Sequence, residues 1–155
     1  MNKKPRACLT AADITVGMSV SRKYTITKKD VQKFGEIAED FNPAHFDEEY
    51  AKNTKFGRPI AHGALSIAKI SGVLGMDIPG LGAVWANQSI KFLAPVFIDE
   101  EHTVTVTATK VTPKFVVLST ICTNSEGKEV LTGEATMFPI PQKIKEQTDV
   151  SSLIE

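Results

Sequence analysis

A carboxylate and an imidazole stand five residues apart in the segment Glu39–Asp47, which is the densest group of reactive side chains in the chain. Asn42-Pro43 lies between Asp40 and His45, and proline disfavours the helical region for the residue that precedes it. The two side chains are therefore expected on a fixed turn, where they can hold a water between them and move its protons. The structural alternative is a helix end followed by an Asx turn, in which Asn42 bonds local backbone and His45 is solvated.

A second cluster, Arg58-Pro59-Ile60-Ala61-His62-Gly63, precedes an apolar stretch that predicts a helix over residues 61–74. The first backbone N–H groups of a helix have no intrahelical partner and carry partial positive charge, so an oxyanion is stabilised there. For Gly63 the alternative is close packing at a crowded helix start. For His62 we expect a structural role, as a satisfied, partly buried imidazole that bonds to the preceding loop.

Metal-binding and hydrolase interpretations fit these residues poorly. Read as an EF-hand loop from Asp40, the chain has His45 where glycine is required and Ala51 where the bidentate glutamate belongs. Zinc is disfavoured because the three histidines and two cysteines show no pair at the short spacings of helix or knuckle sites. A serine hydrolase needs a GxSxG elbow, and Gly63-Ala64-Leu65-Ser66 lacks the second glycine. We therefore expect no metal ion and no cofactor.

The bulk composition excludes several kinds of partner. Lys+Arg and Asp+Glu both number 18, so no net field attracts nucleic acid or anionic lipid. Cys8 and Cys122 lack the spacing of a disulfide framework, which suits reduced thiols in a cytoplasmic protein. The longest mostly apolar stretch, residues 60–74, contains His62 and Lys69 and is shorter than the roughly 20 residues that span a bilayer. The start of the chain leads into polar residues, so no export signal is expected.

The N-terminal half of the chain is expected to position the first cluster. Residues 18–27 are rich in β-branched and aromatic types and predict a strand. The Thr27-x-x-Asp30 pattern predicts the start of a helix over residues 28–39, with apolar residues on one face. A short helix capped by Asp47 should follow the turn.

The rest of the chain predicts an antiparallel sheet around one helix. The helix over residues 61–74 is apolar on all sides, which places it inside the protein. A hairpin is expected at residues 124–127. Strands are expected at about residues 83–96, 102–112, 114–124 and 128–139, the last three as an antiparallel meander. We predict one α+β domain over residues 1–155, with loosely attached termini at about 1–12 and 140–155.

Taken together, these residues resemble the MaoC-like, or R-specific, enoyl-CoA hydratase family. The family signature is Asp-x-Asn-Pro-x-His, then five residues and a small one, and here it reads Asp40-Phe41-Asn42-Pro43-Ala44-His45 with Ala51. Residues 58–63 follow at the usual distance, and the similarity covers about residues 13–139. Ala44 replaces the larger aliphatic residue usual before the histidine, which leaves the reaction intact and affects the shape of the acyl pocket.

The resemblance implies a single hot-dog domain that works as a homodimer, with acyl-CoA thioesters as substrates in a tunnel at the subunit interface. It implies reversible hydration of a trans-2-enoyl-CoA to an (R)-3-hydroxyacyl-CoA. Asp40 would accept a proton from the water as hydroxide attacks the β-carbon, and His45 would supply a proton to the α-carbon. Gly63 matches the backbone donor to the thioester oxygen.

The resemblance also assigns supporting residues and leaves alternatives open. Asn42 would orient the turn and the water, and Ser71 would help to hold the histidine loop or the water. Leu65, on the helix after Gly63, is expected beside the acyl chain. The alternatives are a dehydratase acting on acyl carrier protein and a non-catalytic acyl-CoA-binding module. A thioesterase is disfavoured because the central helix carries no Asp or Glu.

Overall fold

Five antiparallel strands form the scaffold of the computed structural model, which describes residues 7–148. They run in the spatial order β1-β3-β4-β5-β2, so β1 and β2 are the edges. The expected meander of the last three strands and its turn at residues 124–127 are confirmed. The strands are β1 (Ser19–Thr25), β2 (Val84–Phe92), β3 (Glu101–Val111), β4 (Val116–Asn124) and β5 (Glu129–Phe138).

Alternation along the central strands puts one face of the sheet in the core. In β3, Val104, Val106 and Ala108 are at most 1% exposed, and the threonines between them are less buried. Leu118 and Cys122 of β4 are fully buried on the same face. This is the period of two that a half-buried strand requires.

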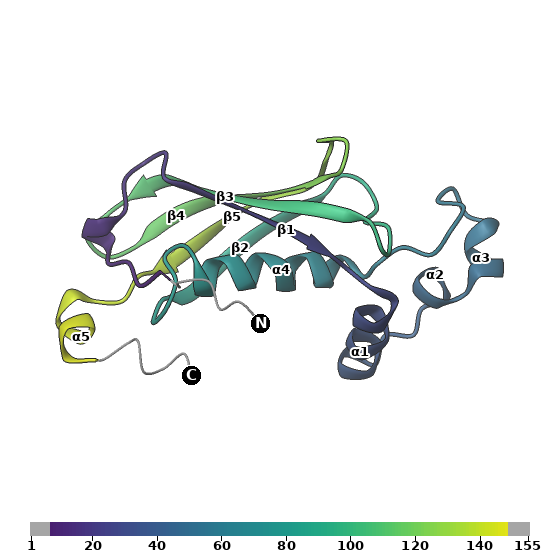
Figure 1. The fold of residues 1–155 in the computed structure, drawn as a ribbon, viewed down its shortest axis with the longest axis horizontal. Helices are drawn as coiled ribbons and strands as arrows, with labels where there is room; N and C mark the ends of the chain where they lie inside the picture. Colours follow the sequence, from purple (N-terminus) through teal and green to yellow (C-terminus); the bar gives the residue numbers. More distant parts are fainter. Residues whose placement is uncertain (1–6, 149–155) are drawn as a thin grey trace.

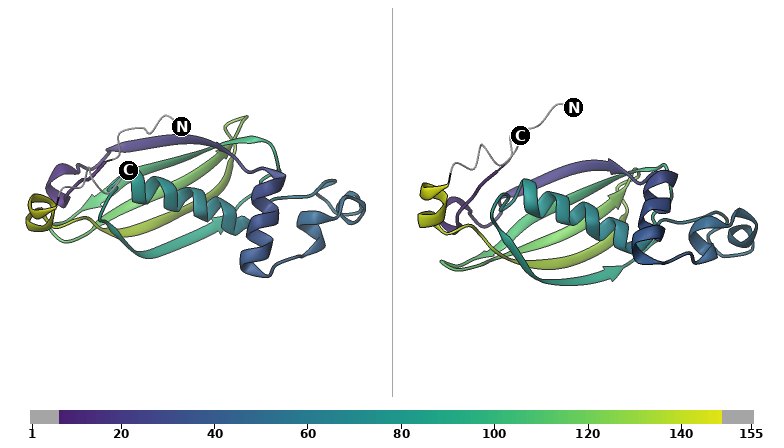
Figure 2. Two further views of the ribbon diagram at one scale, coloured as in Figure 1. Left: turned by 60° about the horizontal axis from the view of Figure 1, so that its bottom comes forward. Right: turned by 90° about the horizontal axis from the view of Figure 1, so that it is seen from below.

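The helix α4 (Gly63–Met76) lies along that apolar face, with the sheet curving over it (Figures 1 and 2). It starts at Gly63 rather than Ala61 and continues to Met76. Ile70, Val73 and Leu74 point into the core and are at most 1% exposed. A sheet around one long helix is the hot-dog arrangement that the resemblance implies.

The prediction that this helix is buried on all sides is wrong for the single chain. Ala64, Ala68 and Ser71 on its outer face are exposed, because the sheet covers only the opposite side. A helix that is apolar all round gains free energy from a second cover. Burial of the outer face of α4 against another apolar surface would therefore be favourable.

Three helices project beyond one end of the sheet in every view (Figures 1 and 2). They are α1 (Lys28–Ala38), α2 (Pro43–Phe46) and α3 (Glu48–Lys52). The predicted caps are confirmed: Thr27 and Asp30 form a capping box, and Asp47 accepts a hydrogen bond from the N–H of Tyr50 at 2.9 Å. We call residues 28–52 the projecting segment.

The described parts of the N- and C-terminal segments are bound to the rest of the protein, contrary to expectation. The N–H of Leu9 donates to the carbonyl of Pro79 at 2.9 Å, and the short helix η1 (Ala11–Asp13) follows. Lys145 of α5 (Gln142–Gln147) pairs with Asp13 at 3.0 Å, which ties the two ends together. Residues 1–6 and 149–155 lie outside the described part. None of the helices in residues 7–148 has the length and apolar character that a membrane crossing requires.

Candidate active site

The turn after α1 folds back tightly on that helix. Glu39 ends α1 in the left-handed conformation, with φ 54°, and the N–H of Asp40 then donates to the carbonyl of Gly35 at 3.1 Å. A Cβ on Gly35 would lie 2.8 Å from the ring of Phe46 and 3.2 Å from the carbonyl of Asp40. A side chain at position 35 would therefore require the Phe46 ring and the turn to shift away from α1.

Short-range hydrogen bonds fix the turn itself. A carboxylate oxygen of Asp40 accepts from the N–H of Asn42 at 3.1 Å, and the side-chain oxygen of Asn42 accepts from the N–H of Ala44 at 3.0 Å. Pro43 is the first residue of α2, where its missing N–H costs nothing. Asn42 is exposed and caps α2, so its contacts match the expected role of orienting the turn.

The ring of His45 is oriented by the strand segment that leads to α4. Its Nδ1 lies 2.8 Å from the carbonyl of Ile60, and the N–H of Ile60 donates to the carbonyl of Ala44 at 3.1 Å. A carbonyl only accepts, so Nδ1 carries a proton and Nε2 remains available for proton transfer. This Nε2 atom is the group that can exchange a proton with a bound molecule.

His62 joins the two residues that the turn presents. It is 2% exposed, its Nε2 lies 3.1 Å from the carbonyl of Asp40, and its ring centroid is 3.9 Å from that of His45. Burial lowers the pKa of His62, and the neighbouring His45 lowers it further, against the opposing effect of Asp40. The expectation of a satisfied, partly buried imidazole that bonds to the preceding loop is wrong: His62 is buried and bonds to the turn at Asp40, and its Nδ1 has no hydrogen-bond partner among the described residues.

Asp40, His45 and His62 each bring one oxygen or ring nitrogen into a group whose atoms lie within 4.8 Å of one another. Two hydrogen bonds of about 2.8 Å to one water span up to about 5.6 Å, so this spacing suits a bridging water.

Two imidazoles and a carboxylate are also ligand types that a divalent ion accepts. However, the Nε2 of His62 and the Nδ1 of His45 already lie on backbone carbonyls. An ion would have to use the remaining ring nitrogens or break those bonds.

The start of α4 is directly connected to this group, because Gly63 follows His62 in the chain. His62 occupies the N-cap position without a side-chain cap, and its carbonyl accepts from the N–H of Leu65 at 3.0 Å. The N–H of Gly63, the first of α4, has no hydrogen-bond acceptor among the described residues. A Cβ on Gly63 would lie 2.7 Å from the ring of Phe92, so the close packing that was the alternative for Gly63 is present. Close packing and oxyanion binding are compatible, since the former concerns the α-carbon and the latter the N–H.

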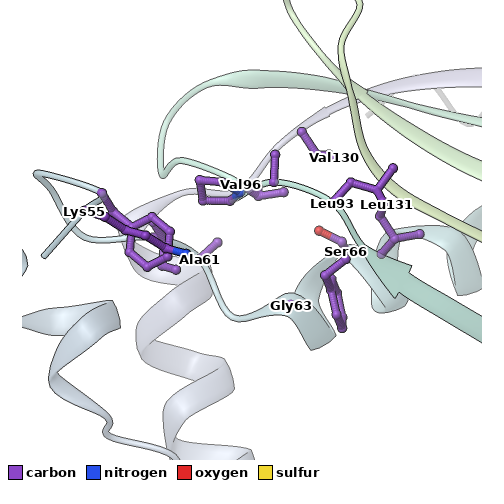
Figure 3. Close-up of a pocket in the computed structure, with 13 residues that line it drawn as sticks. Lys55, Ala61, Gly63, Ser66, Leu93, Val96, Val130 and Leu131 are labelled. Atoms are coloured by element: carbon purple, nitrogen blue, oxygen red, sulfur yellow. The ribbon is translucent and has the colours of Figure 1, made fainter.

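A cavity of about 380 Å³ opens beside Gly63 (Figure 3). Its walls are mainly apolar, as a chain of methylene groups requires. Figure 3 shows Ser66 rising from α4 below Leu93, and Lys55 beside Ala61 toward the other end. The lining residues are Lys55, Phe56, Ile60, Ala61, Gly63, Ser66, Phe92, Leu93, Ala94, Pro95, Val96, Val130 and Leu131.

Two of the expected supporting residues lie elsewhere. Leu65 is 8% exposed and packs in the core, outside the lining of this cavity. Ser71 is exposed on the outer face of α4, eight residues and so roughly 12 Å along the helix from Gly63. Within one chain Ser71 therefore does not join the group around Asp40, and its expected role requires another subunit.

Ser66 takes the place in the cavity wall that was expected for Leu65. It is 1% exposed, and its hydroxyl has no hydrogen-bond partner of normal geometry in the described part of the chain. The hydroxyl of Tyr24 faces it from β1, and burial raises the pKa of Tyr24 above its usual range, so this hydroxyl stays protonated. In the sequence, Ser66 is a polar residue within an otherwise apolar helix turn, and it was considered above only as part of a hydrolase motif.

Comparisons with known proteins agree with this arrangement. The chain is 49% identical over 128 residues to an (R)-specific enoyl-CoA hydratase from Rhodospirillum rubrum, covering 81% of this chain and 88% of the relative. It is 31% identical to a mitochondrial 3-hydroxyacyl-[acyl-carrier-protein] dehydratase from Solanum lycopersicum, covering 81% and 78%. The solved structure of an R-hydratase from Pseudomonas aeruginosa superposes with a TM-score of 0.81 at 33% identity, covering 86% and 87%. The MaoC-like domain model matches residues 11–130, and the chain belongs to the MaoC-like domain family.

Proposed function

We propose that this protein is an (R)-specific enoyl-CoA hydratase, a hydro-lyase that adds water reversibly to trans-2-enoyl-CoA and forms (R)-3-hydroxyacyl-CoA. The proposal depends mainly on the turn that holds one side-chain oxygen of Asp40 and one ring nitrogen of His45 within 4.8 Å of each other. This turn lies next to the start of α4, which has no side-chain cap. The relatives that catalyse this class of reaction cover most of the chain. Asp40, His45 and Gly63 are the proposed catalytic residues.

The reaction begins with a water held between Asp40 and His45. Asp40 accepts a proton from the water while the hydroxide adds to the β-carbon of the enoyl group. Negative charge moves to the thioester oxygen, where the N–H of Gly63 donates to it. In the proposed cycle His45 starts with a proton on Nε2 as well as on Nδ1 and delivers the Nε2 proton to the α-carbon. The proton that Asp40 took from the water then moves to Nε2 of His45 before the next turnover. One water is thereby added, with no net change in the enzyme.

The mainly apolar lining of the cavity beside Gly63 supports a thioester substrate with an apolar acyl group. Lys55 contributes a positive charge beside this cavity for the anionic groups of the carrier. The proposal requires no metal and no further cofactor, because the thioester itself withdraws charge from the reacting carbons. CoA and acyl carrier protein share the phosphopantetheine arm, so the assay described below compares the two carriers.

The proposal includes a homodimer. The edge strand β2 and the residues after it expose the apolar side chains Val84, Phe92 and Leu93, and the outer face of α4 lies uncovered. The other edge, β1, carries the charged residues Arg22 and Lys23 instead. Pairing of β2 with β2 of a second copy would cover an open edge and bring the two α4 helices together. Ser71 would then face the partner.

We place the protein in the cytoplasm as part of the same proposal. Its two cysteines are free thiols in the structure, which agrees with a reducing compartment. Neither nucleic acid nor membrane is a proposed partner, since positive and negative side chains are equal in number.

The decisive experiment is a hydration assay with crotonyl-CoA. We expect loss of the absorbance of the conjugated enoyl thioester and formation of the (R)-3-hydroxy product by chiral analysis. The same acyl group on acyl carrier protein is the matched substrate. A strong preference for the carrier protein would make the enzyme a 3-hydroxyacyl carrier-protein dehydratase. Binding without turnover of either thioester would leave an acyl-CoA-binding module and overturn the proposal.

A further inference from the structure

His62 is the one described residue for which contacts with both Asp40 and His45 are recorded, and it also precedes Gly63. Its Nε2 lies 3.1 Å from the carbonyl of Asp40 and 3.8 Å from a carboxylate oxygen of the same residue. Asp40 and His45 lie in one turn, whereas Gly63 begins a distant helix, and His62 stands 22 positions after Asp40 in the chain. A single buried ring thus links the turn to the helix start.

The tautomer of His62 follows from its hydrogen bond. The carbonyl of Asp40 can only accept, so Nε2 must carry the proton. The Nδ1 atom is buried without a hydrogen-bond partner among residues 7–148 and holds a lone pair. Protonating Nδ1 would place an unpaired charge in this buried position, which is costly. The ring is therefore a neutral donor.

Rings enclose His62 on its other sides. Its centroid lies 3.9 Å from that of His45, 4.8 Å from that of Phe34 and 5.7 Å from that of Phe46. The titratable groups that face it are Asp40 and His45, and the two phenylalanines are neutral. Because His62 is neutral, it packs against the tilted ring of His45 without repelling a proton carried by that ring.

We propose that His62 is a positioning residue, which holds Asp40 and His45 at the spacing of one bridging water by donating to the Asp40 carbonyl and packing against the His45 ring. This inference rests on the proposed function of the pair. His62 does not line the cavity and is not proposed to touch substrate. Its loss should therefore affect the chemical step more than substrate binding.

Two substitutions separate the two contacts of His62. His62→Phe keeps a stacking ring and removes the hydrogen bond to Asp40, whereas His62→Gln keeps an N–H donor and removes the ring. A shift of about 1 Å in a catalytic group can cost about 10²-fold. We expect a fall in kcat of about this size for His62→Phe. KM should change less than about threefold, because His62 is not proposed to touch substrate. We expect a smaller fall in kcat for His62→Gln.

His102 provides a matched control. It is 1% exposed, its Nδ1 lies 3.1 Å from the carbonyl of Glu100, and it stacks on Tyr24. It contacts neither Asp40 nor His45 in the recorded interactions, so His102→Phe removes a comparable buried imidazole outside the site. We expect this variant to lose stability but keep kcat. A loss of kcat in His102→Phe equal to that in His62→Phe would overturn the inference, because burial alone would then explain both.

Long-range ¹H–¹⁵N NMR of the unmodified protein gives a readout that needs no substrate. His62 should show the Nε2–H tautomer, and its pKa should lie below that of an ordinary histidine, because burial disfavours the charged ring. An Nδ1–H tautomer, or wild-type kcat in folded His62→Phe, would refute the positioning role. If His62→Phe does not fold, His62→Gln and the NMR signals decide. Absence of turnover in the wild type would instead refute the proposed function, whatever tautomer His62 shows.

Discussion

The ring of Phe92 covers the α-carbon of Gly63, so closely that a Cβ on Gly63 would lie 2.7 Å from two of its atoms. Phe92 is the last residue of the edge strand β2, and Gly63 begins the central helix. Their contact therefore joins the sheet to the proposed oxyanion donor at the cavity wall.

Gly63→Ala should reduce kcat/KM by about 10²-fold, because the methyl group displaces either the Phe92 ring or the first N–H of α4. Steady-state kinetics with crotonyl-CoA measures the effect. Gly75→Ala is the control on the same helix, since nothing lies within 4 Å of its added Cβ. The control should keep full activity and gain about 0.5–1 kcal/mol in the free energy of unfolding. Equal activity in the two variants would remove Gly63 from the mechanism.

Asp40→Asn should keep the fold and lower kcat by roughly 10²–10⁴-fold, because the amide retains the shape of the side chain but cannot accept the proton. Asp47→Asn changes a carboxylate in the same segment that caps α3 through the N–H of Tyr50. Asparagine also caps helices, so this control should retain both activity and stability. Turnover close to that of the wild type in Asp40→Asn would assign the proton transfer to another group.

Ala68→Glu should convert the proposed homodimer into a monomer, because it places a charge in the middle of the uncovered face of α4. Light scattering at micromolar concentration measures the mass of both forms. Ala12→Glu makes the same change at an exposed position on η1, which lies at the end of the molecule opposite α1, α2 and α3 (Figure 1), and should leave the mass unchanged. A wild type that is already monomeric would contradict the dimer.

Removal of metal ions should leave activity unchanged, since the proposed reaction needs only the carboxylate, the imidazole and the helix N–H. The check is exhaustive dialysis against a chelator, followed by elemental analysis and the hydration assay. The test matters because Asp40, His45 and His62 lie close enough together for a divalent ion to be considered. Activity that disappears on dialysis and returns with zinc would make the site metal-dependent.

Acidification should destabilise the protein through His62. Its pKa in the folded state is lowered from 6.5, mainly by burial, so the unfolded chain binds this proton more readily than the folded one. The free energy of unfolding therefore rises with pH up to about 6.5, the pKa of this histidine in the unfolded chain. It falls as the pH drops below that value toward the lower pKa of the folded state. Thermal unfolding at pH 7 and at lower pH should show this slope, and His62→Phe should reduce it. An unchanged slope in that variant would place the proton uptake elsewhere.

Local chemistry in the sequence determined most of the elements. Thr27 and Asp30 predict the start of α1, and Asp47 predicts the start of α3, because capping involves side chains and N–H groups only a few residues apart. The Asn42-Pro43 turn and the hairpin after Asn124 are local for the same reason. The alternating pattern of β3 likewise predicts its buried face.

Only the tertiary structure decided which side chains meet at the site. Neighbouring helical residues differ in direction by about 100°, so the position of the sheet determines that Ser66 reaches the cavity while Leu65 enters the core and Ser71 faces outward. His62 is 22 residues from Asp40 in the chain, and no local pattern predicts their contact. It arises because α1 and the start of α4 pack at the same end of the sheet, where burial also keeps the ring neutral.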